Sequence, residues 1–177
     1  MDRHCQHLSL FSGRALWQGG HIVDKTLNHS RFIGLIRHTL PKAKIIWVRR
    51  DPMDTAWSCF KTFFNKSFDW TFSLKGIARY FKMEDRIFEN WCAQYPNDIH
   101  VVQYEDLVQS PETVIPAMLA HCGLTDELLT RRFYETRRSV TTASLAQVRR
   151  PLSKKSIGKW RAYEKQLAPF IDAYFSK

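Results

Sequence analysis

Apolar positions along the chain fall into two alternating patterns. Short apolar runs that end in polar or charged residues predict β-strands at 21–25, at 44–49 and within 98–107. The run 45–48 has no polar position, which is typical of a strand buried on both faces. We therefore expect 44–49 to be the most buried strand of the chain.

Apolar residues elsewhere recur at helical spacing. The expected helices span 27–39, 54–64, 74–94, 110–123, 125–135 and 158–175, and residues 136–158 are polar and irregular. Pro41 ends the first helix, Gly123 closes the fourth, and Pro169 disturbs the sixth. The second helix is expected to begin at Asp54, whose side chain can accept from the free amides of a first turn.

Strands that alternate with helices indicate an α/β domain, with a parallel sheet flanked by helices on both faces. A length of 177 residues favours a single domain spanning 1–177. Ligands of such sheets bind beyond the carboxyl ends of the strands. Those ends carry Lys25, the pair Arg49-Arg50 and the pair Tyr104-Glu105. We expect a site for a charged ligand there, where about three parallel strands end.

Composition narrows the class of ligand. The formal net charge is +10, which favours an anionic partner such as a nucleic acid or a phosphorylated or sulfated small molecule. An apolar fraction of 44% excludes a disordered chain. The four cysteines have neither zinc nor C-x-x-C spacing, so we expect reduced thiols, no metal site and a cytoplasmic protein. Neither a signal peptide nor a run of roughly 18 apolar residues occurs, so no membrane partner is expected.

The segment KIIWVRRDPMDTAWS, residues 44–58, joins a strand, paired arginines and a helix start. It resembles the 3′-phosphate-binding strand–turn–helix of sulfotransferases that use 3′-phosphoadenosine 5′-phosphosulfate (PAPS). The resemblance implies that Arg50 and Ser58, eight residues apart, hold the 3′-phosphate of the nucleotide. Arg offers a fork of donors, and a helix amino end adds free N–H groups and a favourable dipole. Arg49 is expected to lie on the other side of the strand.

Three further segments resemble the same family. In VQYEDLV, Tyr104 would approach the adenine. Residues 139–167 resemble the C-terminal segment of the tyrosylprotein and tetratricopeptide-linked branch, in which Ser144 and Lys159, fifteen residues apart, would return to the nucleotide phosphates. Lys25, at the end of HIVDK, would neutralise charge on the sulfuryl group during transfer. The motifs span about 20–165, and the resemblance implies a P-loop-NTPase-like fold.

The chain also departs from the family pattern. Sulfotransferases carry a phosphate loop of the form P-R-S-G-T-T before this region, and no such loop follows an apolar strand here. We expect either a domain truncated at its N-terminus or a chain that has lost catalysis, with weak or no activity. A missing strand would leave an open sheet edge, filled by residues 1–20 or by a second copy, so a homodimer is favoured. The catalytic base stays unassigned.

The resemblance implies sulfuryl transfer from PAPS to an unknown hydroxyl or amine acceptor, on a glycan, a peptide or a small molecule. The aromatic stretch 60–72 would either line the acceptor pocket or belong to the core. One alternative is a non-catalytic basic protein that binds nucleotides or nucleic acid, although the cations gather at strand ends and in one C-terminal segment. A kinase of similar build is disfavoured, because no Walker loop occurs.

Overall fold

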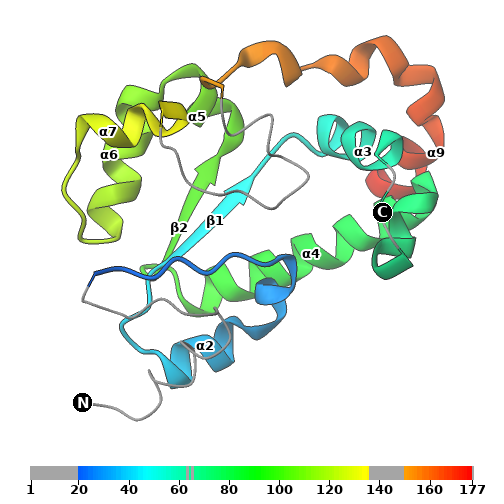
Figure 1. Cartoon of the computed structure of the whole chain (residues 1–177). Helices are drawn as coiled ribbons and strands as arrows, with labels where there is room; N and C mark the ends of the chain where they lie inside the picture. The colour runs from blue at the N-terminus through cyan, green and yellow to red at the C-terminus, as the bar shows by residue number, and fades with distance from the viewer. Residues whose placement is uncertain (1–19, 63, 65, 136–149, 177) are drawn as a thin grey trace.

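The computed structural model describes residues 20–62, 64, 66–135 and 150–176, and it combines helices with a small parallel sheet (Figure 1). The strands are β1 (Ile45–Arg49) and β2 (Ile99–Gln103). The α-helices are α2 (Ile33–Thr39), α3 (Pro52–Lys61), α4 (Leu74–Gln94), α5 (Tyr104–Gln109), α6 (Pro111–His121), α7 (Leu128–Arg131) and α9 (Glu164–Phe175). The 3₁₀ turns are η1 (Leu27–Phe32), η2 (Lys66–Phe72), η3 (Phe133–Glu135), η4 (Lys154–Ser156) and η5 (Lys159–Tyr163).

The two strands pair in parallel, as predicted, with a register that runs from Ile45 opposite Ile99 to Arg49 opposite Gln103. The predicted strand at 21–25 is wrong, and the described sheet has two strands instead of about three. Ile22 and Val23 are 67% and 89% exposed. Among the described residues, the short apolar run at 21–25 has neither a neighbouring strand to take its backbone hydrogen bonds nor a surface to cover its side chains.

On each face of the sheet, a helix packs against only one of the two described strands. On one face α4 packs against β1, where the rings of Trp47 and Phe88 lie 5.1 Å apart. On the other face α6 packs against β2, through the stacked rings of His100 and His121. On that second face Val48 of β1 is 57% exposed, so the expectation that 44–49 is buried on both sides is wrong. In the described part of the chain nothing covers this half of β1, and the expected homodimer stays a prediction.

The N-cap of helix α3 lies three residues earlier than expected. Asp51 is its N-cap, because the Asp51 carboxylate accepts from the Asp54 backbone N–H at 2.8 Å. Pro52 occupies the first helical position, where a missing N–H costs nothing. The prediction that Asp54 caps the helix is therefore wrong, and Asp54 lies inside the first turn.

The other helices follow the sequence pattern to different degrees. Helix α4 has the predicted bounds, and the Ser73 hydroxyl caps it by accepting from the Gly76 N–H at 3.0 Å. The predicted helix 125–135 is reduced to α7 and η3. Leu128 is 76% exposed, and a short helix without a packed apolar face is only marginally stable. None of the helices in the described ranges is long and apolar enough to cross a membrane.

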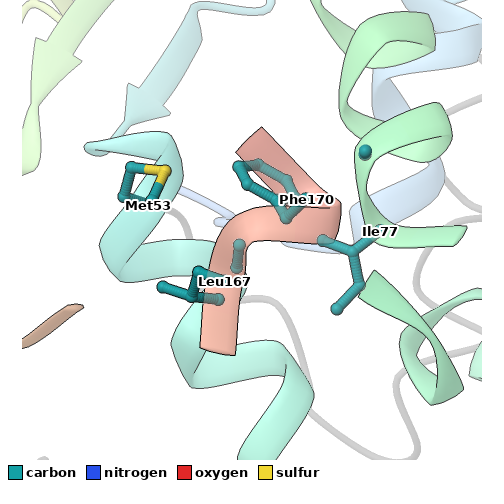
Figure 2. Close-up of a cluster of buried hydrophobic side chains, with 6 residues drawn as sticks. Met53, Ile77, Leu167 and Phe170 are labelled. Atoms are coloured by element: carbon teal, nitrogen blue, oxygen red, sulfur yellow. The ribbon is translucent and has the colours of Figure 1, made fainter. Parts of the chain in front are cut away.

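The main hydrophobic core lies where α3, α4 and α9 meet, beside the carboxyl end of β1. Figure 2 shows Met53 of α3, Ile77 of α4, and Leu167 and Phe170 of α9 close together in this junction. In Figure 1, α9 returns beside α3 and α4 although it lies far from them in sequence. This packing fixes the C-terminal part of the chain next to the start of α3.

Candidate functional site

The two arginines at the end of β1 point to opposite sides, as expected. Arg49 donates to a carboxylate oxygen of Asp85 on α4 at 2.5 Å, and its guanidinium lies 4.3 Å from the ring centroid of Phe88. Arg50 donates to the carbonyl of Ser156 at 2.7 Å, and its guanidinium lies 4.8 Å from the ring centroid of Tyr104. Arg49 is therefore part of the packing on α4, whereas Arg50 faces the C-terminal segment.

Arg50, Tyr104 and Ser156 form a small polar group, here called the Arg50 cluster. The hydroxyls of Tyr104 and Ser156 are hydrogen-bonded at 2.9 Å, and all three residues are half-buried. The Nε of Arg50 is buried and has no hydrogen-bond partner among the described residues. A buried donor without an acceptor is costly, so the guanidinium has unused capacity to bind an anion.

A backbone contact ties the loop after β1 to the end of β2. The Asp51 N–H donates to a carboxylate oxygen of Glu105 at 3.0 Å. Tyr104 and Glu105 directly follow β2, as expected, and they are the first residues of α5. Parallel pairing brings the carboxyl ends of β1 and β2 to one edge, so Arg50 and Tyr104 meet there as predicted from the fold class.

The role of Asp54 was not predicted from the sequence. Its side chain is 2% exposed, and its two carboxylate oxygens accept from the backbone N–H groups of Gly158 at 2.5 Å and Trp160 at 3.1 Å. The signal in the sequence was two aspartates three residues apart at one helix start, since only one of them can be the cap. The other is free to bind elsewhere, and here it binds a segment more than 100 residues away.

The remaining predicted site residues lie in different environments. Ser58 is half-buried on α3, and its hydroxyl has no hydrogen bond within the described part of the chain. Lys159 is exposed at the start of η5, between the two amides that Asp54 holds. Lys25 is exposed and makes no hydrogen bond or ion pair with another described residue. Ser144 lies outside the described residues.

The charge of Arg50 also acts on a neighbouring thiol. Burial raises the pKa of Cys59 to about 11, and the nearby Arg50 guanidinium opposes this rise only in part. Cys59 is therefore a neutral thiol at pH 7 rather than a nucleophile. Groups of three or more His, Cys, Asp or Glu side chains that could hold a metal ion do not occur in the ranges that the structure describes.

Comparison with known proteins identifies the family. A family model described as "Sulfotransferase family" matches residues 7–127, a span that includes Arg50, Asp54 and Tyr104. A protein of Aquifex aeolicus (strain VF5), described as an uncharacterized protein, is 35% identical over 154 residues. The match covers 85% of this chain but 20% of that protein, so the chain spans about a fifth of the relative's length. With its mixed helical structure and small parallel sheet, the chain belongs to the sulfotransferase family.

Proposed function

We propose that this domain binds PAPS and transfers its sulfuryl group to a hydroxyl or amine acceptor. We also propose that its sheet is of the P-loop-NTPase type. Within the family, we place the chain in the tyrosylprotein and tetratricopeptide-linked branch, as the sequence motifs imply. The observation that carries it is the Arg50 cluster, in which a strand-end guanidinium meets Tyr104 beside the amino end of α3. A buried Nε without a partner supports an anion as the natural ligand of Arg50.

The proposed nucleotide site uses the residues at the carboxyl edge of the sheet. Arg50 and Ser58 hold the 3′-phosphate, Tyr104 contacts the adenine, and Ser144 and Lys159 approach the phosphates from the C-terminal segment. The positive end of the α3 dipole adds to the attraction for an anion. Lys159 is well suited to this role because its backbone is fixed between two amides bound to Asp54, while its side chain is exposed.

For sulfuryl transfer, the protein mainly needs to orient the two substrates and to neutralise charge. Sulfuryl transfer in line between two oxygens is accelerated by holding donor and acceptor together and by neutralising the charge that develops. Lys25 supplies a cation for the sulfuryl oxygens in this proposal, and its exposed side chain is free to reorient. The acceptor hydroxyl or amine loses its proton as the new bond to sulfur forms and the bond to the nucleotide phosphate breaks.

The aromatic stretch 60–72 divides between the two roles that the sequence left open. Trp70 stacks on Tyr80 with ring centroids 4.0 Å apart and packs against the main core, so it serves the fold. Phe60, at the end of α3, is exposed and remains a candidate for contact with the acceptor. We assign no acceptor beyond a hydroxyl or amine compound.

The nucleotide assignment predicts selective binding of the desulfated product. Isothermal titration calorimetry should give tighter binding of 3′-phosphoadenosine 5′-phosphate (PAP) than of AMP, which lacks the 3′-phosphate. Arg50→Ala should weaken PAP binding by about 1.5–3 kcal/mol, the range for a hydrogen bond to a charged group, and leave AMP binding almost unchanged. Arg50→Lys should recover part of the loss, because it keeps the charge without the fork.

The matched control is Arg131→Ala, which removes the same charge from an ion pair with Asp126 on an exposed part of the chain. This variant should bind PAP like the wild type. Equal affinity of the wild type for PAP and AMP would contradict the 3′-phosphate assignment. An equal loss in the Arg50→Ala and Arg131→Ala variants would mean that net charge, rather than a site, attracts the nucleotide.

A further inference from the structure

Asp54 is a buried carboxylate that makes no ion pair with any other described residue. Burial of a charge is costly unless hydrogen bonds replace the lost water. Here the N–H groups of Gly158 and Trp160 provide that replacement, one for each carboxylate oxygen. The position of Asp54 in the first turn of α3 adds the favourable end of the helix dipole. The carboxylate and the 158–160 backbone therefore stabilise each other.

The backbone at Gly158 is shaped for this contact. Gly158 has φ +73°, in the left-handed region that side chains disfavour, and it directly precedes η5. A Cβ at this position would lie 2.1 Å from the Arg161 Nη1. Glycine thus permits the turn that directs the amides of residues 158 and 160 toward one carboxylate.

The segment that Asp54 holds is the same segment that meets the Arg50 cluster. Ser156, two residues before Gly158, accepts from Arg50 through its carbonyl and bonds to Tyr104 through its hydroxyl. Lys159 lies between the two held amides. A shift of the 158–160 backbone would therefore move Ser156 away from Arg50 and Lys159 away from its present position.

We propose that Asp54 is a positioning residue for the nucleotide site: its carboxylate fixes the C-terminal segment so that Ser156 and Lys159 complete the site around Arg50. This inference rests on the proposed function. In this proposal Asp54 acts through the segment, because both of its carboxylate oxygens are already bound to backbone N–H groups. The segment has a second attachment, because the rings of Trp57 and Tyr163 stack with centroids 3.8 Å apart. Loss of the carboxylate should therefore misplace the segment without releasing it.

The test compares Asp54→Asn with Glu112→Gln, which makes the same chemical change in the first turn of α6, at an exposed position. In Asp54→Asn one carboxylate oxygen becomes an NH₂ group that opposes a backbone N–H. Amide hydrogen exchange by NMR should show at least about a tenfold faster exchange at Gly158 and Trp160, with β1 and α4 unchanged. In Asp54→Asn the affinity for PAP should fall about tenfold, while the affinity for AMP should stay close to that of the wild type. The Glu112→Gln variant should match the wild type in its exchange rates and in both affinities.

A second variant, Gly158→Ala, alters the contact from the C-terminal segment and leaves α3 intact, so it tests the proposal even if Asp54→Asn fails to fold. It should give the same loss of PAP affinity, and the double variant should lose no more than the worse single variant. Unchanged exchange at residues 158 and 160 would overturn the proposed contact. Faster exchange with wild-type PAP affinity would overturn the positioning role.

The two measurements distinguish a failure of the Asp54 contact from a failure of nucleotide binding. A wild-type protein that does not bind PAP would overturn the proposed function and, with it, the positioning role. The exchange rates would still decide whether Asp54 holds the segment, because they are measured without nucleotide.

Discussion

At the scale of single residues, the partner that a side chain finds decides its role. Arg49 and Arg50 are neighbours with the same chemistry, yet Arg49 is neutralised by Asp85 while Arg50 meets only a carbonyl and an aromatic ring among the described residues. A cation without a carboxylate partner attracts anions more strongly than one in an ion pair. The paired arginines therefore divide into one that stabilises the fold and one that is available for a ligand.

The environment of Cys59 leads to a prediction at the same scale. Its pKa of about 11 leaves a very small fraction of thiolate at pH 8, whereas an unfolded cysteine has a pKa near 8.5. Iodoacetamide should therefore modify Cys59 at least about a hundredfold more slowly in the native chain than in urea. Mass spectrometry of the peptide that contains Cys59 measures both rates. Equal rates in the two states would contradict the burial of this thiol.

The sequence predicted that Arg50 and Tyr104 lie close together but could not assign the acids beside them. Spacing and the fold class were enough to bring Arg50 near Tyr104, because parallel strands end at one edge. Asp51 and Asp54 satisfy the same local rule for a cap. The choice between them depends on Gly158 and Trp160, which are distant in sequence, and no local pattern contains that information.

At the scale of elements, one carboxylate joins three of them. Asp85 of α4 accepts from Arg49 of β1 and from the hydroxyl of Tyr174 on α9. Burial first, and then the hydrogen bond to Asp85, raise the pKa of Tyr174 to about 12. The protonated phenol therefore favours the folded state.

The raised pKa of Tyr174 makes the free energy of unfolding fall as the pH rises above 10. The pKa of Tyr174 is higher in the folded chain than its usual value near 10, so its contribution to stability is complete below pH 10 and is lost as the pH rises toward 12. In Tyr174→Phe, the free energy of unfolding should fall less between pH 9.5 and 11.5 than in the wild type. At pH 7 the variant should be less stable by about 1 kcal/mol, the value of one hydrogen bond.

Urea unfolding, followed by tryptophan fluorescence at each pH, measures this difference. Tyr134→Phe is the matched control, since the Tyr134 hydroxyl makes no hydrogen bond within the described residues. Identical pH profiles for the wild type and Tyr174→Phe would mean that the Asp85 contact does not link α9 to α4.

The long helix α4 was predictable from its own pattern, whereas the short apolar run 21–25 was not. Helix α4 repeats its apolar face over 21 residues, and the local signal fixes both of its ends. The run 21–25 offers two apolar residues, Ile22 and Val23, which any extended segment can carry. Whether such a run becomes a strand depends on a neighbour, and that neighbour is a property of the whole fold.

At the scale of the whole molecule, three arginines among the 27 Lys and Arg residues form ion pairs with carboxylates in the described ranges. Arg37 is paired with Asp98, Arg49 with Asp85 and Arg131 with Asp126. These pairs reduce the density of free cations that a nucleic-acid backbone would require. A small anion that enters one site, by contrast, needs only the local group around Arg50.

This distribution predicts weak and strongly salt-dependent binding of nucleic acid. A duplex of random sequence should bind with a dissociation constant no tighter than about 10⁻⁶ M at physiological salt, the non-specific range. PAP affinity should change much less than duplex affinity between 50 and 200 mM NaCl. Fluorescence anisotropy with a labelled duplex, with PAP as a competitor, measures both. Duplex binding tighter than PAP binding would instead favour the nucleic-acid alternative.

The hydrogen bonds between Asp54 and the backbone of residues 158 and 160 join parts of the chain that are 104 and 106 residues apart. A ribosome that adds about 5–20 residues per second needs roughly 5–20 s to make the intervening segment. During this interval the emerging polypeptide already contains Arg50 and, later, Tyr104, but it lacks the piece that completes their surroundings. With the proposed nucleotide site, the nascent protein would therefore gain nucleotide binding only after residue 160 has left the exit tunnel. A frameshift between α6 and η4 would keep both strands, but it would remove the partners of Asp54 at residues 158 and 160 together with the α9 part of the main core.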